Sequence, residues 1–167
     1  MANFWLAQAN IGRMRAPLTD PLMEGFVTEL DHINSLADQS PGFVWRLQTE
    51  EGDATSIRAF DDALILFNMS VWESLAALHR FVYASEHVTP LRSRRQWFEE
   101  MKGPILVLWW VEEGHYPTVL EAKARFEILR EKGPSQEAFT FRQPFPAPGQ
   151  KTTERPEVDA EFCGGTI

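Results

Sequence analysis

The stretch ALILFNMSVW, which runs from Ala63 to Trp72, is the clearest strand pattern in the sequence. Its residues alternate between two faces, as the side chains of a β-strand do. One face is wholly apolar and consists of Ala63, Ile65, Phe67, Met69 and Val71, while the other consists of Leu64, Leu66, Asn68, Ser70 and Trp72. A second stretch, ILVLWWV at 105–111, is apolar on both faces. Both stretches predict strands of a sheet that is buried on two sides.

Together with these two stretches, the sequence predicts four strands and several helices. Strands are expected at 4–11, 43–49, 63–72 and 105–111. Helices are expected at 21–37, after Ser74 up to a break at 85–88, again from Thr89 onward, and from Thr118 to Gly133. The start at 21 follows from Asp20 and Pro21, which are typical of the first positions of a helix.

The order strand, helix, strand, strand, helices, strand predicts an α+β fold of the ferredoxin-like βαββαβ type with an extra C-terminal helix. We expect this domain to span 1–142. From 143 to 167, several prolines lie among polar residues, which predicts a flexible Pro-rich tail.

Within the strand at 43–49, strict alternation places Phe43 and Arg46 on opposite faces.

Composition and charge exclude several classes of function. The 167 residues include 16 Lys and Arg against 24 Asp and Glu, and the net charge of −8 argues against nucleic acids or anionic membranes as partners. No apolar run approaches the roughly 18 residues of a membrane span, and the first residues lack the basic region of a signal peptide. The single cysteine, Cys163, cannot form a disulfide within the chain. We therefore expect a cytoplasmic protein.

The strands that are apolar on both faces also predict a partner. A ferredoxin-like sheet covers one face with its own helices and leaves the other face for water or for another protein. At about 25 cal/mol per Å², exposing a row of Ile, Phe, Val and Trp side chains would forgo several kcal/mol. We therefore expect a homodimer in which the sheets of two copies pack face to face.

The sequence that begins in this stretch resembles a known family. The resemblance is carried by NMSVWESL at 68–75, by Phe81, Val82, Tyr83 and His87, and by LRSRRQWF at 91–98. These residues are similar to a bacterial family of unknown function in the dimeric α+β barrel superfamily of the antibiotic-biosynthesis monooxygenases. The likeness extends over 4–141 and includes VLWWV at 107–111. Members of the superfamily include cofactor-free oxygenases of aromatic polyketides, heme-degrading enzymes, dehydratases and proteins without a known activity.

The resemblance implies a ligand cavity between the sheet and its own helices. In the cofactor-free oxygenases an Asn four residues before a Trp faces the substrate, and Asn68 and Trp72 repeat that spacing. Arg92 lies near a further site residue of the family. The catalytic Tyr of the family falls near Leu78, so Tyr83 would have to supply its role. The alternative for Asn68 is a structural amide that ties strand to helix, and for Trp72 it is core packing.

Other side chains are candidates because of their chemistry. At the predicted helix break, the imidazole of His87 could turn toward the cavity as a general base, proton shuttle or heme ligand, or it could simply be exposed. Arg92 could anchor a carboxylate or phenolate, or belong to a solvated helix face. Arg46 and Ser70, on the predicted strands, are further candidates for binding the substrate.

Three functions stay open from the sequence alone. The first is a cofactor-free oxygenase of a small, flat, aromatic substrate, in which Asn68 holds a substrate or peroxide oxygen, Arg92 faces an anionic enolate and His87 moves a proton. The second is a non-catalytic module that binds a ligand or serves a structural role. The third is a heme protein that uses His87. We expect no metal site, and no cofactor unless the third hypothesis holds.

Overall fold

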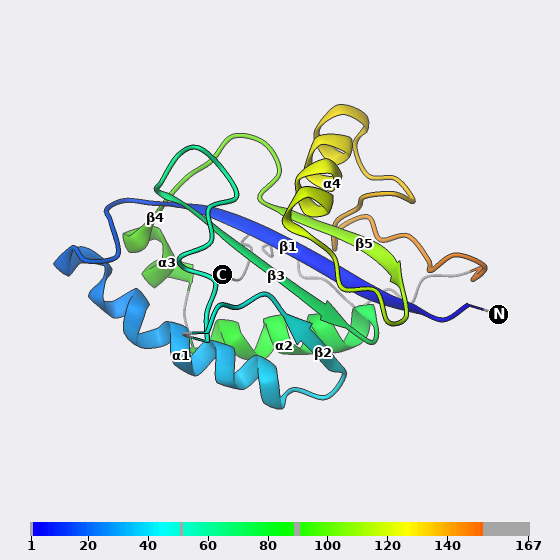
Figure 1. Ribbon diagram of the computed structural model, residues 1–167, viewed down its shortest axis with the longest axis horizontal. Coiled ribbons are helices and arrows are strands. Elements are labelled where there is room, and N and C mark those ends of the chain that lie inside the picture. Colours follow the sequence, from blue (N-terminus) through cyan, green and yellow to red (C-terminus); the bar gives the residue numbers. More distant parts are fainter. Residues whose placement is uncertain (1, 51, 89–90, 152–167) are drawn as a thin grey trace.

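The computed structural model describes residues 2–50, 52–88 and 91–151, without the side chains of 86–88 and 91–92. Its centre is a five-stranded sheet with helices on both faces (Figure 1). The strands are β1 (Phe4–Met14), β2 (Phe43–Arg46), β3 (Ile65–Trp72), β4 (Phe98–Glu99) and β5 (Leu106–Glu112). The helices are the 3-10 turn η1 (Pro21–Met23), α1 (Glu24–Gln39), α2 (Leu75–Val88), α3 (Leu91–Trp97) and α4 (Val119–Lys132). Within the described ranges, no helix is long and apolar enough to cross a bilayer.

The central strand β1 determines the topology of the sheet. It pairs antiparallel with β3 along one edge and with β5 and the short β4 along the other, and β2 extends the sheet beyond β3. Apart from β4, the order of the strands is β2–β3–β1–β5. This is the arrangement of a ferredoxin-like βαββαβ fold. The α+β fold class and the extra C-terminal helix that the sequence predicts are therefore confirmed.

The helices begin at the predicted positions, where side chains cap their first turns. Asp20 accepts a hydrogen bond from the backbone N–H of Leu22 at 2.9 Å, and Ser74 accepts one from the first turn of α2. Thr118 and Glu121 form a reciprocal capping box at the start of α4. Since these caps satisfy backbone donors that have no partner within the helix, they fix where each helix starts.

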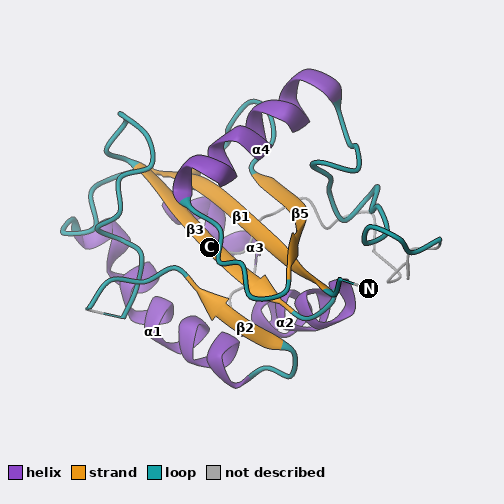
Figure 2. Cartoon of the chain, turned by 45° about the vertical axis from the view of Figure 1, so that its right-hand side comes forward, coloured by secondary structure: helices purple, strands orange, loops and turns teal. Residues whose placement is uncertain are grey.

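Helices α1 and α2 cover one face of the sheet (Figure 2). The core of this layer consists of Leu6, Ile33, Ala37, Trp72, Leu75, Ala77, Leu78, Phe81, Val82, Leu108, Phe139 and Phe141. Trp72 is fully buried, and its ring stacks on that of Phe81 with the centroids 5.0 Å apart. This layer contains the cavity described below.

Helix α4 covers the opposite face of the sheet (Figure 2). Its residues Ala122, Phe126 and Leu129 belong to one core with β1, β3 and β5, in which Met69 and Trp109 are fully buried. The sequence argument assigned this cover to a second copy of the chain. That argument is wrong, because the chain covers the face with its own C-terminal helix. The homodimer stays a prediction, and the apolar face no longer supports it.

A bulge in β2 corrects the predicted face of Arg46. Phe43 pairs with Trp72 and Arg46 with Ser70, so β2 takes three steps along its chain where β3 takes two. The extra residue places both Phe43 and Arg46 on the face toward α1 and α2. Strict alternation predicted opposite faces, which is wrong because it assumes a regular strand.

Helix α2 continues through the predicted break at 85–88. It ends at Val88, and Ser85 is fully buried with its Oγ donating to the carbonyl of Val82 at 2.9 Å. Since the helix continues without the predicted interruption, His87 belongs to α2 and not to a break.

The residues after 142 pack against the sheet before the described chain ends. Trp110 Nε1 donates a hydrogen bond to the carbonyl of Phe145 at 2.9 Å, and the ring of Phe145 lies 6.0 Å from that of Phe139. Ala147 is also buried. The rest of the predicted tail, 152–167 with Cys163, lies outside the described residues.

Candidate ligand-binding site

A cavity lies between the sheet and helices α1 and α2. It holds about 510 Å³ of space free of protein atoms, including its opening to solvent. Its lining consists of Gln8, Asn10, Ile33, Asn34, Ala37, Arg46, Asn68, Ser70, Leu78, Phe81, Val82, Leu106 and Phe141. A cavity in this position, between the sheet and its own helices, is what the family resemblance implies.

The register of three strands gathers polar side chains on the floor of this cavity. Asn10 of β1 lies opposite Asn68 of β3, and Gln8 lies opposite Ser70. Arg46 of β2 is the neighbour of Ser70 on its other side. Opposed residues of antiparallel strands have Cβ atoms about 4.5–5.5 Å apart, so these side chains can contact one another. The sheet thereby forms one polar patch that faces α1 and α2.

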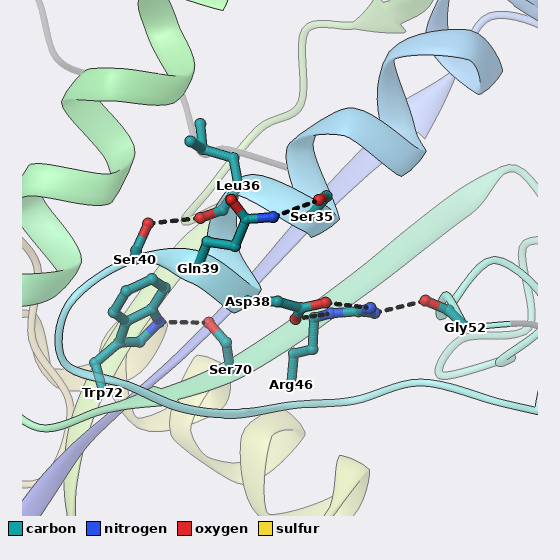
Figure 3. Close-up of polar contacts among 9 residues, drawn as sticks. All are labelled: Ser35, Leu36, Asp38, Gln39, Ser40, Arg46, Gly52, Ser70 and Trp72. Atoms are coloured by element: carbon teal, nitrogen blue, oxygen red, sulfur yellow. Dashed lines mark hydrogen bonds and ion pairs between the residues drawn. The ribbon is translucent and has the colours of Figure 1, made fainter.

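Gln8 is the centre of a hydrogen-bond network on this floor. Its Nε2 donates to Asn68 Oδ1 at 3.0 Å and to Ser70 Oγ at 2.7 Å. Its Oε1 accepts from Asn10 Nδ2 at 3.3 Å. Ser70 Oγ also accepts from Trp72 Nε1 at 2.8 Å (Figure 3). These bonds hold the three amides and the hydroxyl of the floor in defined orientations.

Three polar groups of the network have hydrogen-bonding capacity that the described residues do not use. Asn68 Nδ2 donates to no described group. Ser70 Oγ already accepts two hydrogen bonds, and its own O–H donates to none of the described groups. Asn10 Oδ1 is enclosed and accepts no hydrogen bond. Of these three groups, Asn10 Oδ1 is the enclosed one without a partner, and buried polar groups are nearly always paired in folded proteins. Asn68 is partly exposed, so water can reach its Nδ2.

Arg46 lies at the edge of the floor and is neutralised by a carboxylate. Its Nε lies 2.8 Å from Asp38 Oδ1, and its Nη2 lies 3.2 Å from Asp38 Oδ2 (Figure 3). Its Nη1 donates to the carbonyl of Gly52 at 2.6 Å. Arg46 is buried, and its partner Asp38 reaches solvent. The guanidinium therefore does not bring an uncompensated charge to the cavity.

Apart from Asn34 of α1, the remaining walls of the cavity are apolar. They come from α1, α2, β5 and the segment after α4, and consist of Ile33, Ala37, Leu78, Phe81, Val82, Leu106 and Phe141. A mostly apolar cavity with a few convergent polar groups is typical of a small-molecule site.

His79 of α2 lies against this apolar wall. Its ring lies 6.1 Å from that of Phe141 in an edge-to-face contact. Burial lowers the pKa of His79 below its ordinary value of 6.5, because a charged imidazole would lose hydration. The imidazole is therefore neutral at pH 7 and adds no charge beside the cavity.

The structure brings together three of the site residues predicted from the sequence. Asn68, Ser70 and Arg46 all line the cavity. Trp72 lies behind the floor, where it is fully buried and holds Ser70 by its indole N–H. Tyr83 is 56% exposed and does not line the cavity.

Two other predicted residues stay predictions. His87 lies within α2 and Arg92 within α3, but both side chains lie outside the described part of the chain.

The sequence argument did not single out Gln8, Asn10 or Asn34, which also line the cavity. A signal for two of them was present: Gln8 and Asn10 are polar residues on one face of the central strand, and only polar partners or a ligand can satisfy them there. Asn34 gave no comparable signal, since a polar residue on a surface helix is ordinary.

Comparisons with known proteins add a family and a distant likeness. Residues 5–155 match the family described as "Domain of unknown function (DUF3291)". No curated protein matches the sequence. Among solved structures, a candidate monooxygenase from Shewanella loihica PV-4 has 12% identity and a TM-score of 0.33, with 71% of this chain and 99% of that chain covered. A likeness at this level carries no argument about chemistry.

Proposed function

The chain belongs to the DUF3291 family, whose description assigns no activity, and we propose that it binds a small, flat, uncharged molecule in the cavity between the sheet and helices α1 and α2. One observation carries the proposal. Asn68 and Ser70 direct unused hydrogen-bond donors from the floor of a cavity whose other walls, except for Asn34, are apolar.

The unused donors favour a ligand with an acceptor oxygen. Asn68 is partly exposed, so a ligand that accepts from its Nδ2 takes the place of water there, and such a hydrogen bond contributes about 0.5–1.5 kcal/mol. The hydroxyl of Ser70 offers a second donor. The opposite wall offers the rings of Phe81 and Phe141, which favour stacking or edge contacts with a flat ring. A flat molecule with a carbonyl fits both features.

The charges around the cavity favour a neutral ligand. Arg46 is the one charged residue among those that line the cavity in the described chain, and Asp38 already pairs with it. An anion would have to compete with Asp38 for the guanidinium, and a cation would find no carboxylate on the lining. A neutral ligand avoids the cost of burying an uncompensated charge.

Calorimetric titration of the purified protein with benzamide and with benzoate tests this proposal. The two probes share a flat ring and a carbonyl but differ in charge at pH 7. We expect benzamide to bind at least tenfold more tightly than benzoate. We also expect Asn68→Ala to weaken benzamide about tenfold, which corresponds to the loss of one hydrogen bond from a desolvated site.

Asn3→Ala is the matched control, because Asn3 is exposed and pairs with Glu113 away from the cavity. This variant should bind benzamide like the wild type. The proposal is contradicted if benzamide shows no saturable binding, or if benzoate binds as tightly as benzamide.

The more specific hypothesis is that the protein oxidises the bound molecule without a cofactor. This reaction needs a group that accepts a proton from the substrate. No residue that lines the described cavity is a carboxylate, histidine or lysine. The hypothesis therefore depends on His87, with Asn68 as the group that holds an oxygen. It fails if His87→Ala and Asn68→Ala both leave turnover of the substrate unchanged.

The heme protein and the homodimer also stay predictions. Heme binding would depend on His87, so a Soret band after addition of hemin should disappear in His87→Ala. The homodimer is tested by sedimentation at micromolar concentration, where a particle of 19.1 kDa would exclude it.

A further inference from the structure

A second cavity adjoins the first on the same face of the sheet. It holds about 310 Å³ of space free of protein atoms, including its opening, between α1, β3 and the segment that follows β2. The two cavities share two lining residues, Asn34 of α1 and Asn68 of β3. These two amides therefore lie where the two cavities adjoin, and we call this place the neck.

The second cavity differs from the first in its chemistry. Besides the shared amides, Thr55 is the one polar residue of its lining. The other lining residues are apolar: Phe26, Leu30, Leu47, Ala54, Leu66 and Phe67. The hydroxyl of Thr55 already donates to Asp53 Oδ1 at 2.6 Å. This space therefore suits an apolar group with no hydrogen bonds of its own.

The neck has the opposite character. Asn34 makes no side-chain hydrogen bond to any described residue, and Asn68 keeps its Nδ2 unused. One amide comes from the helix layer and the other from the sheet. A linker between them can accept a hydrogen bond on one edge and donate one on the other, which a secondary amide does.

We propose that both cavities hold one elongated ligand, in which a flat ring in the first cavity is joined through a neutral amide-like linker at Asn34 and Asn68 to an aliphatic chain in the second. This inference rests on the proposed function, because it needs the first cavity to bind the ring. It adds the class of the ligand: an aromatic ring and an aliphatic chain on either side of a polar, uncharged linker.

Calorimetry with benzamide, N-butylbenzamide and N-hexylbenzamide tests this proposal. Each methylene that enters an apolar cavity raises affinity about fourfold. We therefore expect N-hexylbenzamide to bind the wild type at least tenfold more tightly than benzamide, with N-butylbenzamide between them. Equal affinity for the three probes overturns the inference, although benzamide binding would still support the proposed function.

Ala54→Phe fills the second cavity and leaves the lining of the first intact. We expect it to weaken N-hexylbenzamide at least tenfold and to leave benzamide unchanged. Ala2→Phe, at an exposed position, is the matched control and should change neither affinity. If Ala54→Phe unfolds the protein, the chain-length series in the wild type decides the question.

Two outcomes distinguish a failure of the proposed function from a failure of the inference about the second cavity. If none of the probes binds, the proposed function and the inference are both overturned. If benzamide binds but Ala54→Phe weakens it as much as it weakens N-hexylbenzamide, the chain does not enter the second cavity and only the inference is overturned.

Discussion

The indole Nε1 of Trp72 lies 2.8 Å from the Oγ of Ser70, and this bond connects the apolar core under α2 to the polar floor of the cavity. Ser70 also accepts from Gln8 Nε2 at 2.7 Å, so both of its lone pairs are occupied. Its proton can then serve a ligand. Trp72 is thus a core residue that also positions the hydroxyl of Ser70 in the candidate site.

Ser70→Ala should destabilise the protein by about 1–3 kcal/mol, because it removes the acceptor of two buried donors, Trp72 Nε1 and Gln8 Nε2. Urea unfolding measures this change in the free energy of unfolding. Ser35→Ala is the control, since Ser35 is exposed on α1, and it should change stability by no more than about 0.5 kcal/mol. Equal effects of the two substitutions would mean that the network contributes nothing to stability.

Asp38→Asn should give the cavity an affinity for anions. The amide cannot neutralise Arg46, so the buried guanidinium becomes available to a carboxylate. We expect benzoate to bind this variant at least tenfold more tightly than it binds the wild type, as measured by calorimetry. Asp31→Asn, at an exposed position of α1, should leave benzoate binding unchanged. Unchanged benzoate affinity in Asp38→Asn would show that Arg46 does not reach the cavity.

Phe126→Ala should destabilise the protein by about 3–5 kcal/mol, because Phe126 is buried between α4 and the sheet. Leu120 lies on the same helix but is 77% exposed, so Leu120→Ala should cost no more than about 0.5 kcal/mol. Thermal and urea unfolding measure both values. A small loss in both variants would contradict the finding that α4 covers this face.

The stability of the protein should fall between pH 7 and pH 5 partly because of His79. Burial lowers the pKa of His79, so below about pH 6.5 the unfolded chain binds more protons than the folded protein does. Stability contributed by the neutral imidazole is therefore lost as the pH falls through this range. His79→Gln should lose less stability over the same interval, as followed by Tm. His32→Gln makes the same change at an exposed position and serves as the control. Equal curves for the wild type and His79→Gln would refute the prediction.

The alternation of a single strand sufficed to predict much of the fold and part of the site. Asn68, Ser70 and Trp72 share a face of 63–72 in the sequence, and they share the face toward α1 and α2 in the structure. Because the period of a strand is two residues, a regular strand fixes which side chains appear together.

The rest depended on features that periodicity does not contain. A bulge in β2 turned Arg46 onto the cavity face, and a bulge changes the alternation at one residue. The polar character of Gln8 and Asn10 was visible, but their network with Asn68 depends on the register between β1 and β3. The cover of the second face depended on the direction in which α4 folds back after β5, which the helix pattern alone does not specify.

A crystal structure of the protein soaked with benzamide is the decisive test of the proposed binding site. The account predicts the ring between the sheet and helices α1 and α2, with its carbonyl oxygen within hydrogen-bond distance of Asn68 Nδ2 or Ser70 Oγ. Benzamide bound elsewhere, with this cavity closed by its own side chains, would contradict it.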